Sequence, residues 1–280
     1  MIKLLFVVML VAALAFGADD GCTDTSIGIT PNGSGSDAVT LTVVNDWTLA
    51  NKALGLDVFE GSTVYILAAD NESMHIQAYT TSGTPSATLD LTAANAACFG
   101  VAWNDDLTTD AYYTDDWSDT VLYYTEDFGT TWTTAANPAG SSARGMACDG
   151  ADYWTTNGDG GGLWRFQPGV GAENIAISEP PTQPSGVAVF PYGGNLGVAV
   201  TTYNTHNIYF YEWDGSTMSY LGSAACPGSV SASYGLAYSS SNGHMYWSYK
   251  DGSSIYHISE LSFTITALER SSWGSIKTSF

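Results

Sequence analysis

Positive charge is scarce in this chain of 280 residues. Seven Lys and Arg residues stand against 28 Asp and Glu residues, which gives a formal net charge of -21 at neutral pH. Such an acidic chain repels the phosphate backbone of nucleic acids, so nucleic-acid binding is excluded as a main function. Charged residues of both signs make up only 12% of the chain, and the surface must therefore consist largely of Ser, Thr, Asn, Gly and Tyr.

The familiar local motifs of catalysis and metal binding are also missing. The sequence has no Gly-x-Ser-x-Gly, no His-Glu-x-x-His and no phosphate-binding loop, and its four histidines are isolated from one another. No Cys-x-x-Cys pair occurs, so the cysteines do not indicate a metal site. If the chain is exported, its even number of cysteines predicts up to two disulfides, whose pairing stays open, among Cys22, Cys98, Cys148 and Cys226.

Only one long apolar run is present, at the start of the chain. Residues 4–14 are apolar, Lys3 precedes them and small residues follow, which is the pattern of a secretory signal peptide over residues 1–18. No second run is long enough to cross a bilayer, so we expect a secreted, extracellular or cell-surface protein without a membrane span in its mature chain. Residues 19–37 are rich in Gly, Ser, Thr and Asp and predict a flexible N-terminal arm.

A repeat with a period in the forties organises residues 38–268. Each repeat carries a glycine followed by a large apolar residue and then usually a small one, and successive glycines are 45, 45, 41 and 49 residues apart. Several short alternating strands separated by Gly, Asp or Asn turns follow each glycine, and no stretch has a helical period. The repeat glycines are Gly55, Gly100, Gly145, Gly186 and Gly235.

This repeat predicts an all-β β-propeller of five four-stranded blades. The glycine strands suit the innermost position of each blade, where the sheets converge on the axis and bulky side chains have least room. The strand at residues 38–44 is expected to pair with the last blade and close the ring, because an open ring would expose a sheet edge. The alternative is a sixth, composite blade built from both ends of the chain.

One turn carries a resemblance to a known group of propellers. Thr125-x-Asp127-x-Gly129-x-x-Trp132 resembles the Asp-box of the BNR-type propellers, a superfamily that includes sialidases and sortilin-like receptors. In that group the box is structural and joins the two outer strands of a blade, so the resemblance implies a propeller and no activity. A sialidase also needs three arginines, and here the set is incomplete because one of the three lies in the tail: Arg144, Arg165 and Arg270.

Acidic residues are the candidates for chemistry. Asp57 occupies a small inner-strand position where other repeats carry Ala, so it either binds the backbone of a neighbouring blade or serves as a catalytic or metal-binding carboxylate. A pair of carboxylates in a cleft is what a glycoside hydrolase requires. A loop rich in aspartate is a weak calcium candidate, because Ca²⁺ prefers oxygen ligands: Asp105, Asp106, Asp110, Asp115, Asp116 and Asp119.

The tail at residues 269–280 falls outside the repeat. It combines positive charge with large apolar residues on an acidic protein, which indicates a segment that contacts a partner, through Trp273, Ile276, Lys277 and Phe280. We therefore expect a non-enzymatic extracellular structural or interaction protein that binds itself or other extracellular proteins and forms oligomers or filaments. The alternatives are a lectin-like module that binds glycans through exposed aromatic residues, and a glycoside hydrolase that uses an acidic pair.

Overall fold

The computed structural model describes residues 38–91, 94–95, 97–104, 111–160 and 162–266. The predicted signal peptide, the N-terminal arm, the tail and Cys22 lie outside these residues. So do three of the six aspartates of the calcium prediction, Asp105, Asp106 and Asp110.

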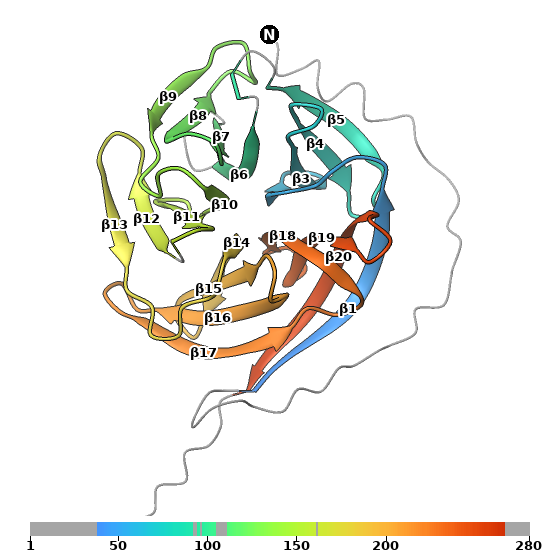
Figure 1. Ribbon diagram of the computed structural model, residues 1–280, viewed down its shortest axis with the longest axis vertical. Coiled ribbons are helices and arrows are strands. Elements are labelled where there is room, and N and C mark those ends of the chain that lie inside the picture. Colours follow the sequence, from blue (N-terminus) through green and yellow to red (C-terminus); the bar gives the residue numbers. More distant parts are fainter. Residues whose placement is uncertain (1–37, 92–93, 96, 105–110, 161, 267–280) are drawn as a thin grey trace, which may run out of the picture.

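Five four-stranded antiparallel sheets stand in a ring around a central axis (Figure 1). The predicted five-bladed all-β propeller is confirmed, and within the described ranges the chain forms no helix, hence none that could cross a membrane. The six-bladed alternative is wrong, because both ends of the described chain supply strands to the same fifth sheet.

The strands are numbered along the chain, and within each blade they follow one another from the axis outward. Blade 1 contains β2 (Leu56–Glu60), β3 (Val64–Asp70), β4 (His75–Thr80) and β5 (Pro85–Asp90). Blade 2 contains β6 (Cys98–Asn104), β7 (Ala111–Asp116), β8 (Val121–Thr125) and β9 (Thr133–Ala136). Blade 3 contains β10 (Ala143–Cys148), β11 (Tyr153–Asn157), β12 (Leu163–Gln167) and β13 (Gly171–Ile175).

The remaining two blades complete the circle. Blade 4 contains β14 (Pro184–Tyr192), β15 (Asn195–Thr202), β16 (Asn207–Trp213) and β17 (Met218–Ala225). Blade 5 contains β18 (Val230–Ser239), β19 (His244–Asp251), β20 (Tyr256–Thr266) and, as its outermost strand, β1 (Ala38–Leu49).

Strand β1 closes the ring by pairing with β20. The pairing runs from Ala38 opposite Thr266 to Leu49 opposite Tyr256, with a bulge near Val43, so the closing strand is longer than the sequence predicted. Asp46 of this strand accepts hydrogen bonds from the Tyr249 hydroxyl at 2.8 Å and from Ser259. These contacts fasten the N-terminal strand to the blade formed by the other end of the chain.

The repeat glycines form a ring of close backbone contacts around the axis. A Cβ atom added at Gly145 would lie 2.8 Å from the Cα of Gly186, and one added at Gly235 would lie 2.2 Å from the carbonyl oxygen of Leu54 in blade 1. A Cβ at Gly55 would in turn lie 2.6 Å from the Cα of Gly100. Only glycine fits at these positions, because each inner strand packs against the backbone of the next one.

Buried hydroxyl groups join successive blades just beside this ring. The Thr201 hydroxyl accepts a hydrogen bond from the Gly186 N–H and donates one to the carbonyl of Tyr234 in the next blade, both at 2.8 Å. Thr156 and Ser248 make the corresponding pairs of hydrogen bonds in blades 3 and 5. In blade 2 this position is taken by a carboxyl group, that of Asp115.

Most of the aromatic residues fill the space between blades, as predicted. Trp154 and Trp213 pack edge to face across the boundary between blades 3 and 4, with ring centroids 6.0 Å apart. Trp247 stacks on Tyr249 in blade 5, with centroids 4.2 Å apart. Trp117 is the exception among the described tryptophans, because 47% of its surface is exposed to solvent.

Candidate functional site

The two ends of the central axis differ in chemistry. We call the end at which the inner strands β2, β6, β10, β14 and β18 begin the entry face, and the end at which they finish the exit face. At the entry face, the residue just before each repeat glycine must lie close to the axis. These residues are Leu54, Phe99, Arg144, Ser185 and Tyr234.

Aromatic residues from three blades meet at the entry face. Phe99 and Tyr234 form the floor of the cluster, with exposed fractions of 7% and 5%, and Tyr203 and Tyr256 are half-buried at its rim. The ring of Tyr234 lies 5.7 Å from that of Tyr203 and 6.1 Å from that of Tyr256, centroid to centroid. We call these four rings, together with the guanidinium of Arg144, the axial mouth.

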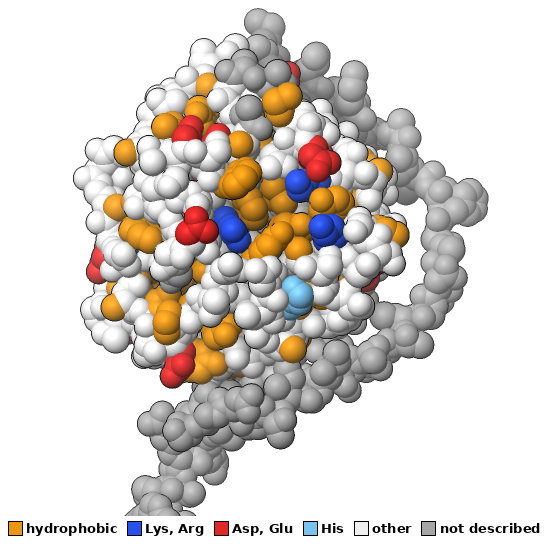
Figure 2. All heavy atoms as spheres, in the orientation of Figure 1, with side chains coloured by type: hydrophobic (Ala, Val, Ile, Leu, Met, Phe, Trp, Pro, Cys, Tyr) orange, Lys and Arg blue, Asp and Glu red, His pale blue; other side chains and the backbone are white. Residues whose placement is uncertain are grey.

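Positive charge gathers around the axial mouth. Arg144 lies over the ring of Tyr203, with its guanidinium carbon 5.0 Å from the ring centroid. Lys250 lies directly opposite Tyr256 in the sheet and therefore on the same face of it. Lys52 is near enough to Tyr256 to act on its pKa. Figure 2 shows Lys and Arg side chains surrounding a central group of hydrophobic side chains on this face.

The hydroxyls of Tyr234 and Tyr256 are uncharged at neutral pH. Burial raises the pKa of Tyr234 well above its usual value, and the neighbouring Tyr203 and Tyr256 raise it further. Burial likewise raises the pKa of Tyr256, although the positive charge of Lys52 opposes this. Neutral phenols both donate and accept hydrogen bonds, so the mouth offers polar groups without negative charge.

A cavity of about 450 Å³ opens at the exit face. Its lining combines carboxylates with aromatic and apolar side chains and includes Asp57, Glu60, Trp103, Asp149, Phe190 and Tyr238. The cavity therefore brings carboxylates and aromatic side chains together, as an acidic pair for glycoside hydrolysis would require.

The carboxylates of this cavity are engaged in holding the fold. Asp57 accepts the Val58 N–H at 2.8 Å with one oxygen and the Trp103 N–H of blade 2 at 2.5 Å with the other. Asp149 accepts the indole N–H of Trp154 at 3.0 Å and also caps its own turn. Of the two roles considered for Asp57, the structure shows the bond to the backbone of a neighbouring blade.

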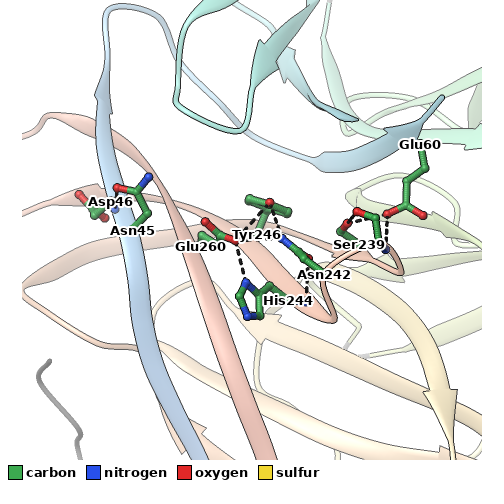
Figure 3. A network of polar contacts seen from close by, with 9 residues as sticks. Asn45, Asp46, Glu60, Ser239, Asn242, His244, Tyr246 and Glu260 are labelled. Carbon is green, nitrogen blue, oxygen red and sulfur yellow. Dashed lines mark hydrogen bonds and ion pairs between the residues drawn. The ribbon is translucent and has the colours of Figure 1, made fainter. Parts of the chain in front are cut away.

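Glu60 joins the first blade to the last. It accepts hydrogen bonds from the hydroxyls of Ser239 and Ser240 and from the backbone of Ser241, in the hairpin that follows β18 (Figure 3). Burial opposes ionisation of Glu60, but these hydrogen bonds outweigh it and lower the pKa of Glu60 below its ordinary value. Glu60 is therefore a poor proton donor at neutral pH, whereas a glycosidase needs a carboxylic acid with a raised pKa.

The three described cysteines are free thiols in separate parts of the ring. Cys98 and Cys148 lie in the inner strands of blades 2 and 3, and Cys226 follows β17. The sequence predicted up to two disulfides, and two are excluded in this structure because two bridges would require at least one bond within this group. Burial raises the pKa of each thiol to about 12, so none is a thiolate at neutral pH.

The three described aspartates of the calcium prediction have different hydrogen-bond partners. Asp115 is buried against the axis, Asp116 accepts the N–H and hydroxyl of Ser118, and Asp119 accepts the Val121 N–H at 2.7 Å. Among the described residues, no group of three or more His, Cys, Asp or Glu side chains is arranged to hold a metal ion. The prediction itself stays open, because half of its residues lie outside the described chain.

The turn at Thr125 to Trp132 joins β8 to β9, the two outer strands of blade 2. The Thr125 hydroxyl accepts the Gly129 N–H at 2.8 Å, and Asp127 accepts the Thr131 N–H at 2.8 Å. Gly129 has a φ of 83°, which glycine adopts without strain. Trp132 packs on the cluster between blades 1 and 2. The hydrogen bonds are local and stabilise the hairpin, and Trp132 anchors it to the neighbouring blade.

The two arginines of the described chain do not meet. Arg165 pairs with Asp152 and lies over Trp154, whereas Arg144 belongs to the axial mouth. The axial mouth was not predicted from the sequence, because its residues come from separate repeats. One signal was present: Phe99, Arg144 and Tyr234 each directly precede a repeat glycine.

Comparisons with known proteins identify the fold. No family model matches the chain, and no curated protein does either. A GH43_1 enzyme from Xanthomonas citri is similar with a TM-score of 0.57 at 9% identity, covering 81% of this chain and 94% of that one. A chain of a nidogen/laminin complex has a TM-score of 0.53 at 11% identity, with coverage of 84% and 97%.

A third solved structure is a gluconolactonase from Xanthomonas campestris, with a TM-score of 0.51 at 11% identity and coverage of 85% and 95%. The three similar structures are two enzymes and a chain of a protein complex. At these identities they share the architecture with this chain and transfer no activity. The chain is thus a β-propeller whose function has to be argued from its own residues.

Proposed function

We propose that this chain is an extracellular, non-enzymatic binding module that takes a saccharide ligand at the axial mouth. The observation that carries the proposal is the convergence of four aromatic rings and one guanidinium at the entry face. Aromatic faces pack against the apolar C–H faces of sugar rings, and the neutral tyrosine hydroxyls and the arginine supply hydrogen bonds to sugar hydroxyls.

The carboxylates of the exit-face cavity favour binding over hydrolysis. Asp57, Glu60 and Asp149 each accept hydrogen bonds from the protein itself. A hydrolase would instead hold one carboxylic acid ready to protonate the leaving group and a second carboxylate facing the sugar. The extracellular location is the prediction made from the leader sequence, and it suits a glycan ligand.

Replacing Tyr203 with alanine is expected to weaken saccharide binding at least tenfold. The change removes a rim ring and one hydroxyl, and the loss of about 1.4 kcal/mol of binding free energy already corresponds to a factor of ten. Binding is measured on a glycan array and then by titration calorimetry with the best ligand. Trp117→Ala is the control, since Trp117 is an exposed aromatic residue outside the mouth.

Two results would contradict the saccharide proposal. One is the absence of saturable binding to any saccharide on the array by a folded protein. The other is loss of binding in Trp117→Ala while Tyr203→Ala binds normally, which would place the site elsewhere on the surface.

Self-assembly through the tail is a separate prediction for residues outside the described chain. A similar propeller occurs in a complex of nidogen with laminin, so the fold is compatible with a role in protein assembly. Removal of residues 269–280, which contain Trp273, Ile276, Lys277 and Phe280, is expected to convert oligomers into monomers without loss of the propeller. Light scattering of both chains measures this, and identical sizes would contradict the prediction.

A further inference from the structure

Arg144 is a positive residue of the axial mouth that no carboxylate of the described chain neutralises by contact. Arg165 forms an ion pair with Asp152, and Lys52 lies 3.2 Å from Glu72. Arg144 has no ion pair within the described chain, and its Nη1 is buried without a hydrogen-bond partner there. Asp159, a carboxylate that acts on it electrostatically, accepts the hydroxyl of Ser142 instead.

The guanidinium of Arg144 is held in place from three sides. It lies over the rings of Tyr203 and Phe99, at 5.0 and 5.9 Å from the centroids. On another side it packs against Gly158, where an added Cβ would lie only 2.1 Å from Nε of Arg144. A guanidinium confined in this way loses little conformational freedom when it binds a planar anion.

The charge of Arg144 is costly to bury without a partner. Burial lowers the pKa of Arg144, which means that the charged form is less well solvated than in water, although Asp159 partly offsets this. An arginine remains protonated under these conditions. A bound anion that accepts hydrogen bonds from the guanidinium would relieve this penalty, since charge-assisted hydrogen bonds are the strong ones.

The distribution of charge points to the same ligand chemistry. The protein has a net charge of -21, yet three of the four described Lys and Arg residues, Lys52, Arg144 and Lys250, lie at or beside the axial mouth. Glu72 pairs with Lys52, so Arg144 and Lys250 supply the attraction, and an anion should be drawn to this part of the described surface more than to the rest of it. Electrostatic focusing of this kind favours binding of anions at the mouth over binding elsewhere.

We infer that the ligand of the axial mouth is an acidic saccharide, one whose carboxylate or sulfate group accepts hydrogen bonds from Arg144 while its ring packs on the tyrosines. This inference rests on the proposed function of the mouth as a saccharide site and adds the chemical class of the ligand. Lys250 contributes longer-range attraction, so binding should weaken as the salt concentration rises.

The test uses the full chain and an array that carries uronate, sialate and sulfated oligosaccharides beside their carboxyl-reduced or desulfated forms. The wild-type protein should bind acidic members at least tenfold more tightly than their neutral forms. Arg144→Gln should lose this preference. Gly158→Ala should also reduce it, because the new methyl group displaces the guanidinium while the net charge stays the same.

Arg165→Gln is the matched control, since it removes one positive charge away from the mouth, and circular dichroism verifies that each variant is folded. Preserved acidic preference in Arg144→Gln, or equal losses in Arg144→Gln and Arg165→Gln, would overturn the assignment to Arg144. Equal binding of acidic and neutral forms by the wild-type protein would overturn the acidic class and leave the saccharide site intact. Binding to no member would overturn both.

Discussion

Alanine at Gly235 is expected to prevent the propeller from folding. The new Cβ would lie 2.2 Å from the carbonyl oxygen of Leu54 and 2.6 Å from the backbone nitrogen of Leu56. These are backbone atoms of the neighbouring inner strand, so they cannot move aside without opening the ring. We expect a loss of more than about 4 kcal/mol in the free energy of unfolding, which is at the severe end for a single substitution.

Urea denaturation followed by circular dichroism measures this loss. If Gly235→Ala does not fold at all, the protein is expected to be insoluble on expression. Gly171→Ala is the matched control, because an added Cβ there meets no atom within 4 Å. The control should be neutral or slightly stabilising, as glycine-to-alanine changes are at sites that accept them. A Gly235→Ala protein as stable as the control would show that the ring of glycine contacts does not limit the fold.

Threonine at Asp115 is expected to make the protein more stable at pH 8. Asp115 is fully buried and accepts the Gly100 N–H at 2.5 Å, in the position where blades 3 and 4 have Thr156 and Thr201. Those hydroxyls also donate to the next blade, which a carboxyl group can do only when it is protonated. Burial raises the pKa of Asp115 to about 7, and Asp116 contributes to this in the same direction.

The sign of the pH dependence follows from this raised pKa. The unfolded chain ionises at an ordinary aspartate pKa of about 4. The folded protein therefore holds its proton over the range in which the unfolded chain loses it, and stability falls as the pH rises from about 4 through 7. Threonine carries no ionisable group, so the stability of Asp115→Thr should change less over this range.

Urea denaturation of both proteins at pH 5 and pH 8 tests this prediction. The advantage of Asp115→Thr at pH 8 should be on the order of 2 kcal/mol and should shrink or reverse at pH 5. Glu126→Gln removes an exposed carboxylate and serves as the control, with no such change expected. An advantage that is equal at both pH values would mean that ionisation of Asp115 is not its cause.

The blade architecture could be predicted from the sequence because each repeat contains the residues that define its own blade. A repeat glycine followed by short alternating strands predicts an inner strand and its partners without reference to other blades. The closing strand was also predicted, although its end at Leu49 was not, since the bulge near Val43 interrupts the alternating pattern before the strand ends. The bond from Asp57 to blade 2 was one of two roles that the pattern allowed.

The axial mouth was not accessible in the same way. Tyr203 and Tyr256 come from loops and strand ends of different repeats, and their distance depends on how five blades are set around the axis. A tyrosine in a β-rich sequence is more often packed between sheets than exposed, as Tyr211 and Tyr246 are in this protein. Alignment of the repeats on their glycines, rather than composition, would have brought Phe99, Arg144 and Tyr234 together.

The pairing of β1 with β20 also sets an order of events during synthesis. Among the described strands, β1 leaves the ribosome first and β20 last, so β1 has no partner until the strands of blades 1 to 4 have been made. Until then the nascent chain carries an unpaired strand, a surface prone to association with other chains. A chain that is truncated before β20 should therefore form an open ring in which β1 is unpaired. Quality-control proteases would recognise the exposed sheet edge of such a chain.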